Sequence, residues 1–67
     1  MEIFAKRLKE LREENKLSLK ELAKKINVSD VAISRWENMQ RIPTIETLYN
    51  IAKYFGVTSD YLIGLED

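Results

Sequence analysis

The apolar residues of this chain recur at the three- and four-residue spacing of a helix, and no stretch alternates long enough to form a strand. Each apolar stripe predicts the buried face of one amphipathic helix. The stripes consist of Phe4, Leu8 and Leu11; Leu19, Leu22, Ala23 and Ile26; Ile33 and Trp36; Ile45, Leu48, Ile51, Ala52 and Phe55; and Tyr61, Leu62 and Leu65. We therefore expect an all-α fold with five helices, near residues 2–14, 18–25, 29–37, 44–55 and 58–63.

Hydroxyl side chains mark the predicted starts of four of these helices, because a serine or threonine oxygen can accept a hydrogen bond from a free amide of the first turn. These residues are Ser18, Ser29, Thr44 and Thr58. Glu21 follows Ser18 at the spacing of a capping box, in which its side chain reaches back to the start of the helix. Gly56 and Gly64 fit the left-handed residues that end the fourth and fifth helices.

Only residues 26–28 separate the second predicted helix from the third, which forces the two helices to cross closely. Ala23 supplies a small side chain at the crossing, and Asn27 tolerates the left-handed conformation that the turn needs. The angle between the helices is filled by Leu22, Ile26, Val28, Ile33 and Trp36. Residues 19–38 are therefore expected to form a helix-turn-helix unit, whose second helix can enter the major groove of DNA.

The composition narrows the chemistry that is open to these 67 residues, which are expected to form one small domain, 1–67. The absence of cysteine and histidine removes disulfides, thiolate chemistry, the usual neutral-pH base and the commonest metal ligand. No glycine-rich phosphate loop accompanies the serine and aspartate residues, so we expect no enzyme activity, metal, cofactor or small-molecule ligand. No apolar run reaches the roughly 18 residues of a membrane span, and no leader opens the chain, which predicts a cytoplasmic protein.

The charges balance overall, with 11 basic and 11 acidic residues, but their distribution is uneven. Residues 1–25 carry eight basic and five acidic residues, whereas residues 44–67 carry one basic and four acidic residues. The net charge of zero opposes a strong overall attraction to nucleic acid. The basic end permits an anionic partner on one face, although an ordinary solvated helix surface explains the same distribution.

A longer pattern of motifs runs from Arg7 to Gly64. It comprises Leu8, Lys9, Arg12, Leu17, Ser18, Glu21, Leu22, Ala23, residues 26–29, residues 33–38, Pro43, Thr47, Leu48, Ile51, Ala52, Gly56, Val57 and residues 60–64. In this order the motifs resemble the lambda-type repressor and Cro family, also called Xre-type helix-turn-helix domains. The resemblance implies a five-helix DNA-binding domain of phage repressors and bacterial regulators, usually a homodimer on a two-fold site. Leu19 and Asn27 depart from the family, which commonly has Gln and Gly there.

The helical phase of residues 29–37 separates an inner face from an outer face. With Ile33 inward, the outer face is lined by Val31, Ser34, Arg35 and Asn38. Arg35 can fork onto guanine O6 and N7, Val31 can pack on a thymine methyl group, and Ser34 can bond a base edge or a phosphate. Asp30, at the side of the first turn, either accepts from a cytosine amine or stabilises the positive start of the helix.

Polar groups beside this outer face are expected to contact the phosphate backbone, which positions a protein on DNA without reading sequence. The candidates are Ser18, Lys20, Ser29, Asn38, Gln40 and Arg41. Free amides at the helix starts headed by Ser18 and Ser29 can hold phosphate oxygens. Lys20 and Arg41 are equally explained as solvated charges, and Arg35 as one half of a surface ion pair.

Further residues are assigned structural roles. Arg12 and Glu37 match the family's ion pair between the first helix and the end of the third, where the planar guanidinium suits a carboxylate. Trp36 shares the phase of Ile33, which favours a core position over stacking on a base. The resemblance also implies a dimer seam at the last helix and the loop before the fourth, although the same residues can cap a small core. The candidates for this seam are Ile42, Tyr61 and Leu65.

Two functions follow from these observations. The first is a repressor-like transcriptional regulator that binds double-stranded DNA sequence-specifically, as a dimer on half-sites about 34 Å apart. The alternative is an antitoxin or adaptor that uses the same fold for protein–protein interaction. The zero net charge, Leu19 and Val31 favour the alternative, whereas Ser34, Arg35 and Asn38 argue against an apolar outer face.

Overall fold

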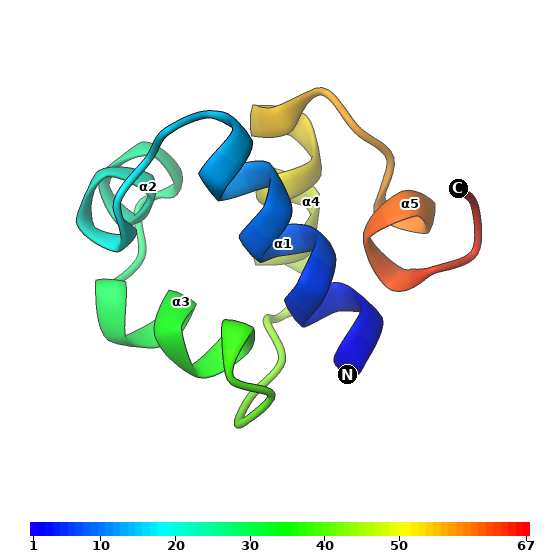
Figure 1. The fold of residues 1–67 in the computed structure, drawn as a ribbon, viewed down its shortest axis with the longest axis horizontal. Coiled ribbons are helices and arrows are strands. Elements are labelled where there is room, and N and C mark those ends of the chain that lie inside the picture. Colours follow the sequence, from blue (N-terminus) through cyan, green and yellow to red (C-terminus); the bar gives the residue numbers. More distant parts are fainter.

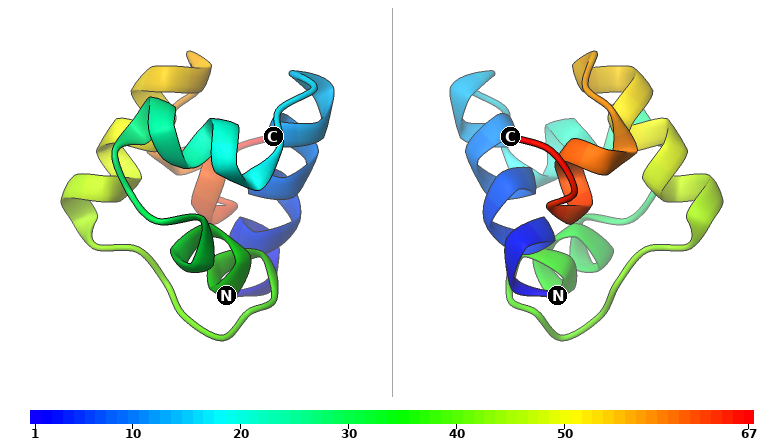
Figure 2. Two further views of the ribbon diagram at one scale, coloured as in Figure 1. Left: turned by 90° about the vertical axis from the view of Figure 1, so that its left-hand side faces the viewer. Right: turned by 90° about the vertical axis from the view of Figure 1, so that its right-hand side faces the viewer.

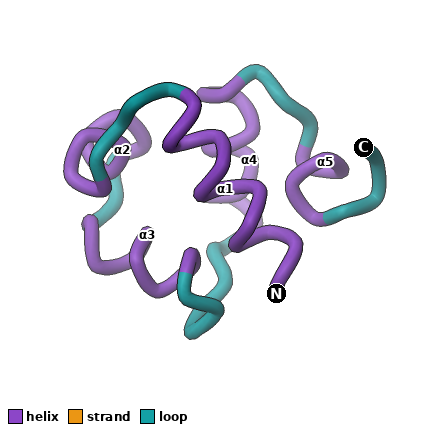
Figure 3. The backbone as a smooth tube through the Cα atoms, in the orientation of Figure 1, coloured by secondary structure: helices purple, strands orange, loops and turns teal.

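The computed structural model describes residues 1–67 and contains five helices and no strands. The helices are α1 (Glu2–Glu14), α2 (Leu19–Ile26), α3 (Asp30–Glu37), α4 (Ile45–Phe55) and α5 (Ser59–Ile63). Short loops connect them, and the segment between α3 and α4 is the longest irregular stretch (Figure 3). The expected all-α, five-helix architecture is confirmed.

Helix α1 lies at the centre of the arrangement and packs against both α3 and α5 (Figure 1). Helix α2 packs against α3 and α4, and α4 packs against α5. Figure 2 shows α2 and α3 on the same side of the molecule, joined by a short turn. The buried core draws on all five helices. It consists of Phe4, Ala5, Leu8, Leu22, Ala23, Ile26, Ile33, Trp36, Ile51, Ala52 and Leu62.

The predicted helix starts are confirmed, because each hydroxyl residue accepts a hydrogen bond from the backbone amide three residues later. At α2, the amide of Glu21 donates to Ser18 Oγ at 3.0 Å, and the amide of Ser18 donates to Glu21 Oε1 at 2.8 Å. This reciprocal pair is a complete capping box. The start of α2 is therefore fixed by residues that are close together in the sequence.

The turn between α2 and α3 has the left-handed residue that its length requires. Asn27 has φ 59° and ψ 50°, and its amide donates to the Ala23 carbonyl oxygen at the end of α2. Asparagine tolerates this conformation better than most residues with a Cβ atom. After this turn, α3 packs against both α2 and α1, so that the helix-turn-helix unit is joined to the first helix through α3.

Two predicted core positions are wrong. Ile45 and Leu65 were expected in buried apolar stripes, but their side chains are 87% and 73% exposed. Leu65 lies beyond the end of α5, which the left-handed Gly64 terminates. Ile45 is the first residue of α4, and the neighbours of this helix, α2 and α5, leave that end uncovered. The buried stripe of α4 consequently centres on Ile51 and Ala52, with Leu48 and Phe55 partly covered.

Candidate nucleic-acid interface

Helix α3 presents one face to the core and the opposite face to solvent. Ile33 and Trp36 are buried, which confirms the core position of the indole, whereas Val31 is 52% exposed and Arg35 is exposed. Ser34 lies half-buried between these two residues on the outer side. Figure 1 places α3 at the periphery of the molecule, at the lower left. One accessible face of α3 thus carries the methyl groups of Val31, the hydroxyl group of Ser34 and the guanidinium group of Arg35.

The starts of α2 and α3 leave backbone donors free. Ser18 Oγ and Ser29 Oγ accept from the third amide of their helices, at 3.0 and 3.1 Å. The amides of the first two residues of each helix have no acceptor within the chain. Two pairs of unsatisfied N–H groups and the positive ends of two helix dipoles therefore lie at the starts of the helix-turn-helix helices.

Acidic side chains occupy the same two helix starts. The Ser18 backbone amide donates to the Glu21 carboxylate, and this hydrogen bond, together with one involving the Ser18 side chain, lowers the pKa of Glu21. Asp30 is the first residue of α3 and lies half-buried in its first turn. Both carboxylates complement the positive ends of their helices. An approaching phosphate would meet these charges as well as the free amides.

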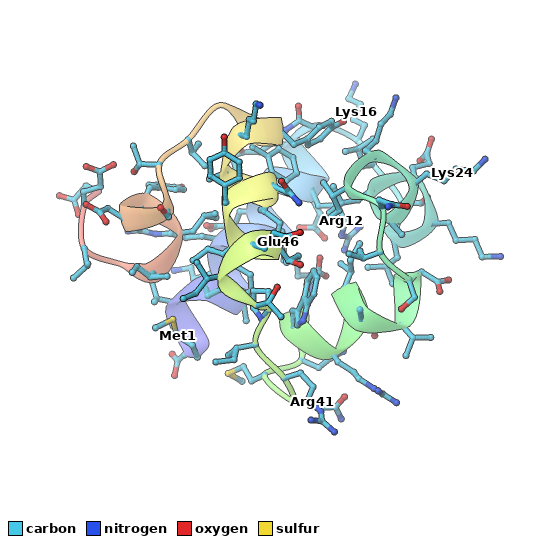
Figure 4. All side chains as sticks on the ribbon, turned by 180° about the vertical axis from the view of Figure 1, so that it is seen from behind. Met1, Arg12, Lys16, Lys24, Arg41 and Glu46 are labelled. Carbon is cyan, nitrogen blue, oxygen red and sulfur yellow. The ribbon has the colours of Figure 1, made fainter.

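The segment after α3 combines a helix end with exposed polar residues. The Asn38 side-chain Nδ2 donates to the Ser34 carbonyl oxygen at 2.8 Å and to Ser34 Oγ at 3.3 Å. The Gln40 backbone amide donates to the Arg35 carbonyl oxygen at 2.8 Å. The Gln40 and Arg41 side chains are exposed, and Figure 4 shows Arg41 and Lys24 extending from the periphery. Asn38 thus uses its donors within the protein, whereas Gln40 and Arg41 keep theirs free.

An ion pair fixes the end of α3 to α1. Arg12 Nε donates to Glu37 Oε2 at 2.7 Å and Arg12 Nη2 to Glu37 Oε1 at 3.0 Å, and the side chains are 14% and 7% exposed. Arg12 Nη1 also donates to the Leu17 carbonyl oxygen at 2.9 Å, just before α2. The hydrogen bond to Glu37 raises the pKa of Arg12. One guanidinium group therefore joins α1, the loop before α2 and α3, and it lies in the interior between the helices (Figure 4).

Comparison with known proteins agrees with this geometry. The family model described as Helix-turn-helix matches residues 8–62, which is most of the chain. The chain belongs to this helix-turn-helix family. None of its five helices combines the length and apolar character needed to cross a membrane.

Relatives of the helix-turn-helix chain are named as transcription regulators. The activator BcrR of Enterococcus faecalis is 39% identical over 64 residues, which cover 96% of this chain and 31% of BcrR. The regulator ImmR of Bacillus subtilis is 36% identical over 64 residues, covering 96% of this chain and 50% of ImmR. The chain thus spans between about a third and about a half of these two curated relatives.

Solved structures confirm the lambda-repressor-like fold of the helix-turn-helix chain. The P22 c2 repressor in complex with a synthetic operator is 32% identical with a TM-score of 0.86, covering 92% of this chain and 94% of the repressor chain. A transcriptional regulator from Vibrio cholerae is 29% identical with a TM-score of 0.82, covering 97% of this chain and 36% of that regulator. The expected family and architecture are therefore confirmed.

The three residues considered for a dimer seam of the helix-turn-helix chain have different surroundings. Ile42 is 68% exposed and lines an apolar groove of about 210 Å³, and Leu65 is exposed outside the lining of that groove. Tyr61 is half-buried beside α1, with the Arg7 guanidinium carbon 4.3 Å from its ring centroid. Arg7 also donates to the Tyr61 and Glu66 carbonyl oxygens. Tyr61 therefore has an intramolecular partner, whereas Ile42 and Leu65 remain accessible.

The apolar groove contains residues that the sequence analysis did not associate with a contact surface. Its lining consists of Met1, Phe4, Ile42, Pro43, Ile45, Leu48 and Ile63. Ile45 was assigned to the core because it fits the apolar spacing of its helix. No sequence signal separates it from the core, because Leu19, which follows its own cap in the same way, packs against the core.

Proposed function

We propose that this chain is a sequence-specific DNA-binding module of a cytoplasmic transcription regulator, which inserts α3 into the major groove. The observation that carries the proposal is the accessible face of α3, where Val31, Ser34 and Arg35 face solvent while Ile33 and Trp36 anchor the helix. The similarity to a repressor solved with a synthetic operator supports the same mode of action.

Base recognition is proposed for four residues of α3. Arg35 donates two parallel hydrogen bonds to guanine O6 and N7, and the exposed Val31 methyl groups pack against a thymine methyl. Ser34 lies between them at the half-buried centre of the face. Asp30 is positioned either to accept from a cytosine amine or to stabilise the start of α3, and its half-buried first-turn position suits the second role.

Phosphate contacts are proposed for the free amides that follow Ser18 and Ser29 and for the exposed side chains of Lys20, Gln40 and Arg41. The amides point along their helix axes and have no acceptor in the chain. The zero net charge does not prevent this, because only the charges beside α3 need to match the phosphates. Asn38 contributes to the same region through the end of α3 that it stabilises.

We also propose that two copies bind a two-fold operator, with the apolar groove as the contact between them. Ile42 and Ile45 are strongly exposed on a surface directly after Gln40 and Arg41, so the contact lies beside the proposed phosphate anchors. The groove is small, so the two copies associate weakly alone and firmly when DNA holds both. Leu65 lies outside the lining of this groove, and Tyr61 is held by Arg7.

The decisive experiment is selection of binding sites from random duplex DNA, followed by salt titration of the selected sequence. The expected consensus is palindromic, with half-sites about 34 Å apart. The logarithm of the binding constant is expected to fall linearly with the logarithm of salt concentration, since phosphate contacts release counterions. Recovery of no enriched duplex sequence would refute the proposal.

A second function, an antitoxin or adaptor module, is favoured by the exposed apolar surface around Ile42 and Ile45. In that case the groove would hold a different protein, and α3 would have no role in reading bases. Substitution of Arg35 separates the two functions. In a regulator it removes base discrimination at one operator position, whereas in an adaptor it leaves the binding of a protein partner to the groove unchanged.

A further inference from the structure

The last turn of α3 contains a side-chain contact that restricts the Ser34 hydroxyl group. Asn38 Nδ2 lies 2.8 Å from the Ser34 carbonyl oxygen and 3.3 Å from Ser34 Oγ. A carbonyl oxygen only accepts hydrogen bonds, so the amide must direct its NH₂ group, not its oxygen, toward Ser34. The same NH₂ group therefore donates to Ser34 Oγ as well.

This contact biases the Ser34 hydroxyl group toward donating a hydrogen bond to a ligand. Its Oγ already accepts from Asn38, and its own O–H group donates to no acceptor within the chain. A free serine hydroxyl rotates and can donate or accept as its surroundings require. With Asn38 donating to one lone pair of the oxygen, the Ser34 proton is directed away from Asn38 and only one lone pair stays available to accept. Donation from Asn38 also polarises the O–H group, so Ser34 is presented to a ligand as a better donor than acceptor.

The direction of this hydrogen bond matters in the major groove. Guanine O6 and thymine O4 accept hydrogen bonds at the position where adenine N6 and cytosine N4 donate them. A hydroxyl biased toward donation favours the bases that accept at this position, whereas a freely rotating hydroxyl accommodates both classes. Purine N7 accepts in adenine and guanine alike, so the exocyclic group carries the discrimination.

We propose that Asn38 is a positioning residue that holds Ser34 as a hydrogen-bond donor, so that this chain prefers guanine or thymine at the base facing Ser34. The inference rests on the proposed DNA binding and specifies what one position of the site reads. It gives Asn38 a role in specificity, in place of a direct contact between its amide and a phosphate, because both donors of the amide are engaged with Ser34.

The test is a double-mutant cycle on a selected operator. Affinities of wild type, Ser34→Ala, Asn38→Ala and the double variant are measured for duplexes carrying each of the four bases at every half-site position. Loss of one neutral hydrogen bond corresponds to about a fivefold change in affinity. We expect both single variants to lose a preference of this size for guanine or thymine at the same position. In the Ser34→Ala background, Asn38→Ala is expected to change no base preference further.

Two further variants make the outcome specific. Asn38→Asp replaces the donor with a carboxylate, toward which the Ser34 proton turns, so the preference at that position is expected to vanish or shift toward adenine or cytosine. Gln40→Ala is the matched control, because this exposed neighbour makes no contact with Ser34; it is expected to weaken all duplexes equally. Circular dichroism verifies that each variant retains its helices.

Three results would overturn the inference. Asn38→Ala could weaken all duplexes equally and keep every preference, which would make Asn38 a phosphate contact or a purely structural residue. Its effect on preference could persist in the Ser34→Ala background, which would show that it acts elsewhere. Wild type could select no duplex, which would overturn the proposed DNA binding together with this inference, whereas the first two results leave DNA binding intact.

Discussion

Single residues of α3 separate cleanly into those that hold the helix and those that are free to contact a ligand. Ile33 and Trp36 fill the core, and Glu37 is bound bidentately by Arg12. Arg35, by contrast, forms no ion pair and no side-chain hydrogen bond within the protein. A guanidinium group without an internal partner keeps its donors for an external acceptor.

Arg35→Ala is expected to remove base discrimination at one position of the operator, at a cost of about 1–3 kcal/mol for the matching sequence. The reason is the loss of the forked contact with guanine O6 and N7. Competition binding with single-base operator variants measures the effect. Lys20→Ala is the control, since a phosphate contact weakens all sequences alike. Equal weakening of unrelated sequences by Arg35→Ala would contradict base reading.

Arg12→Ala is expected to lower the free energy of unfolding by about 2 kcal/mol, because a largely buried Glu37 carboxylate loses its charged hydrogen-bond donor. Urea denaturation followed by circular dichroism measures the change. Replacing both residues, as Arg12→Met with Glu37→Leu, is expected to cost less than the single change, because no unpaired charge remains. An unchanged midpoint for Arg12→Ala would show that the ion pair does not stabilise the fold.

The starts of four helices are set by hydrogen bonds between residues that are close together in the sequence. Ser18, Ser29, Thr44 and Thr58 each act within three residues of their own position, so their roles can be deduced from sequence alone. The left-handed Asn27 follows equally from the short link between α2 and α3. Ile45 could not be placed in this way, because its exposure depends on which other helices cover the end of α4. The Asn38 contact with Ser34 was missed for a related reason, since it depends on a rotamer that sequence spacing does not specify.

Glu21→Gln is expected to destabilise the protein at neutral pH and to have progressively less effect in acid. The Ser18 amide lowers the pKa of Glu21 in the folded state below its ordinary value of 4.5, so the ionised carboxylate stabilises the fold above that value. This stabilisation is lost as the pH falls through the lower folded pKa. Thermal unfolding of both proteins between neutral and acidic pH measures the difference, and a constant difference at every pH would contradict this account.

The whole molecule has two surfaces of different character, the polar outer side of α3 with its flanking helix starts and the apolar groove beside the α3–α4 loop. Large exposed apolar residues that gather in one place usually mark an interaction site. The groove begins immediately after Arg41, so a protein seated in it would lie next to the DNA that Arg41 is proposed to contact. Occupation of the two surfaces is therefore expected to be coupled.

Ile45→Lys is expected to weaken binding to a complete two-fold operator while leaving binding to a single half-site unchanged. The side chain is 87% exposed, so the folding stability should change by no more than about 0.5 kcal/mol. Titrations on duplexes with one or two half-sites measure the coupling. Asn50→Lys, an exposed change on the same helix outside the groove lining, controls for the same single added charge. If both variants lose binding to the complete operator equally, the groove is not the contact between copies.

The division of α3 into two faces has an evolutionary consequence. Selection for a folded protein acts on the side that meets α1 and α2, and selection for a particular target acts on the other side. Changes at Val31 or Arg35 therefore cost the fold little. Under the proposed mode of base recognition, a lineage of such proteins can acquire new target sequences by a few substitutions without passing through unfolded intermediates.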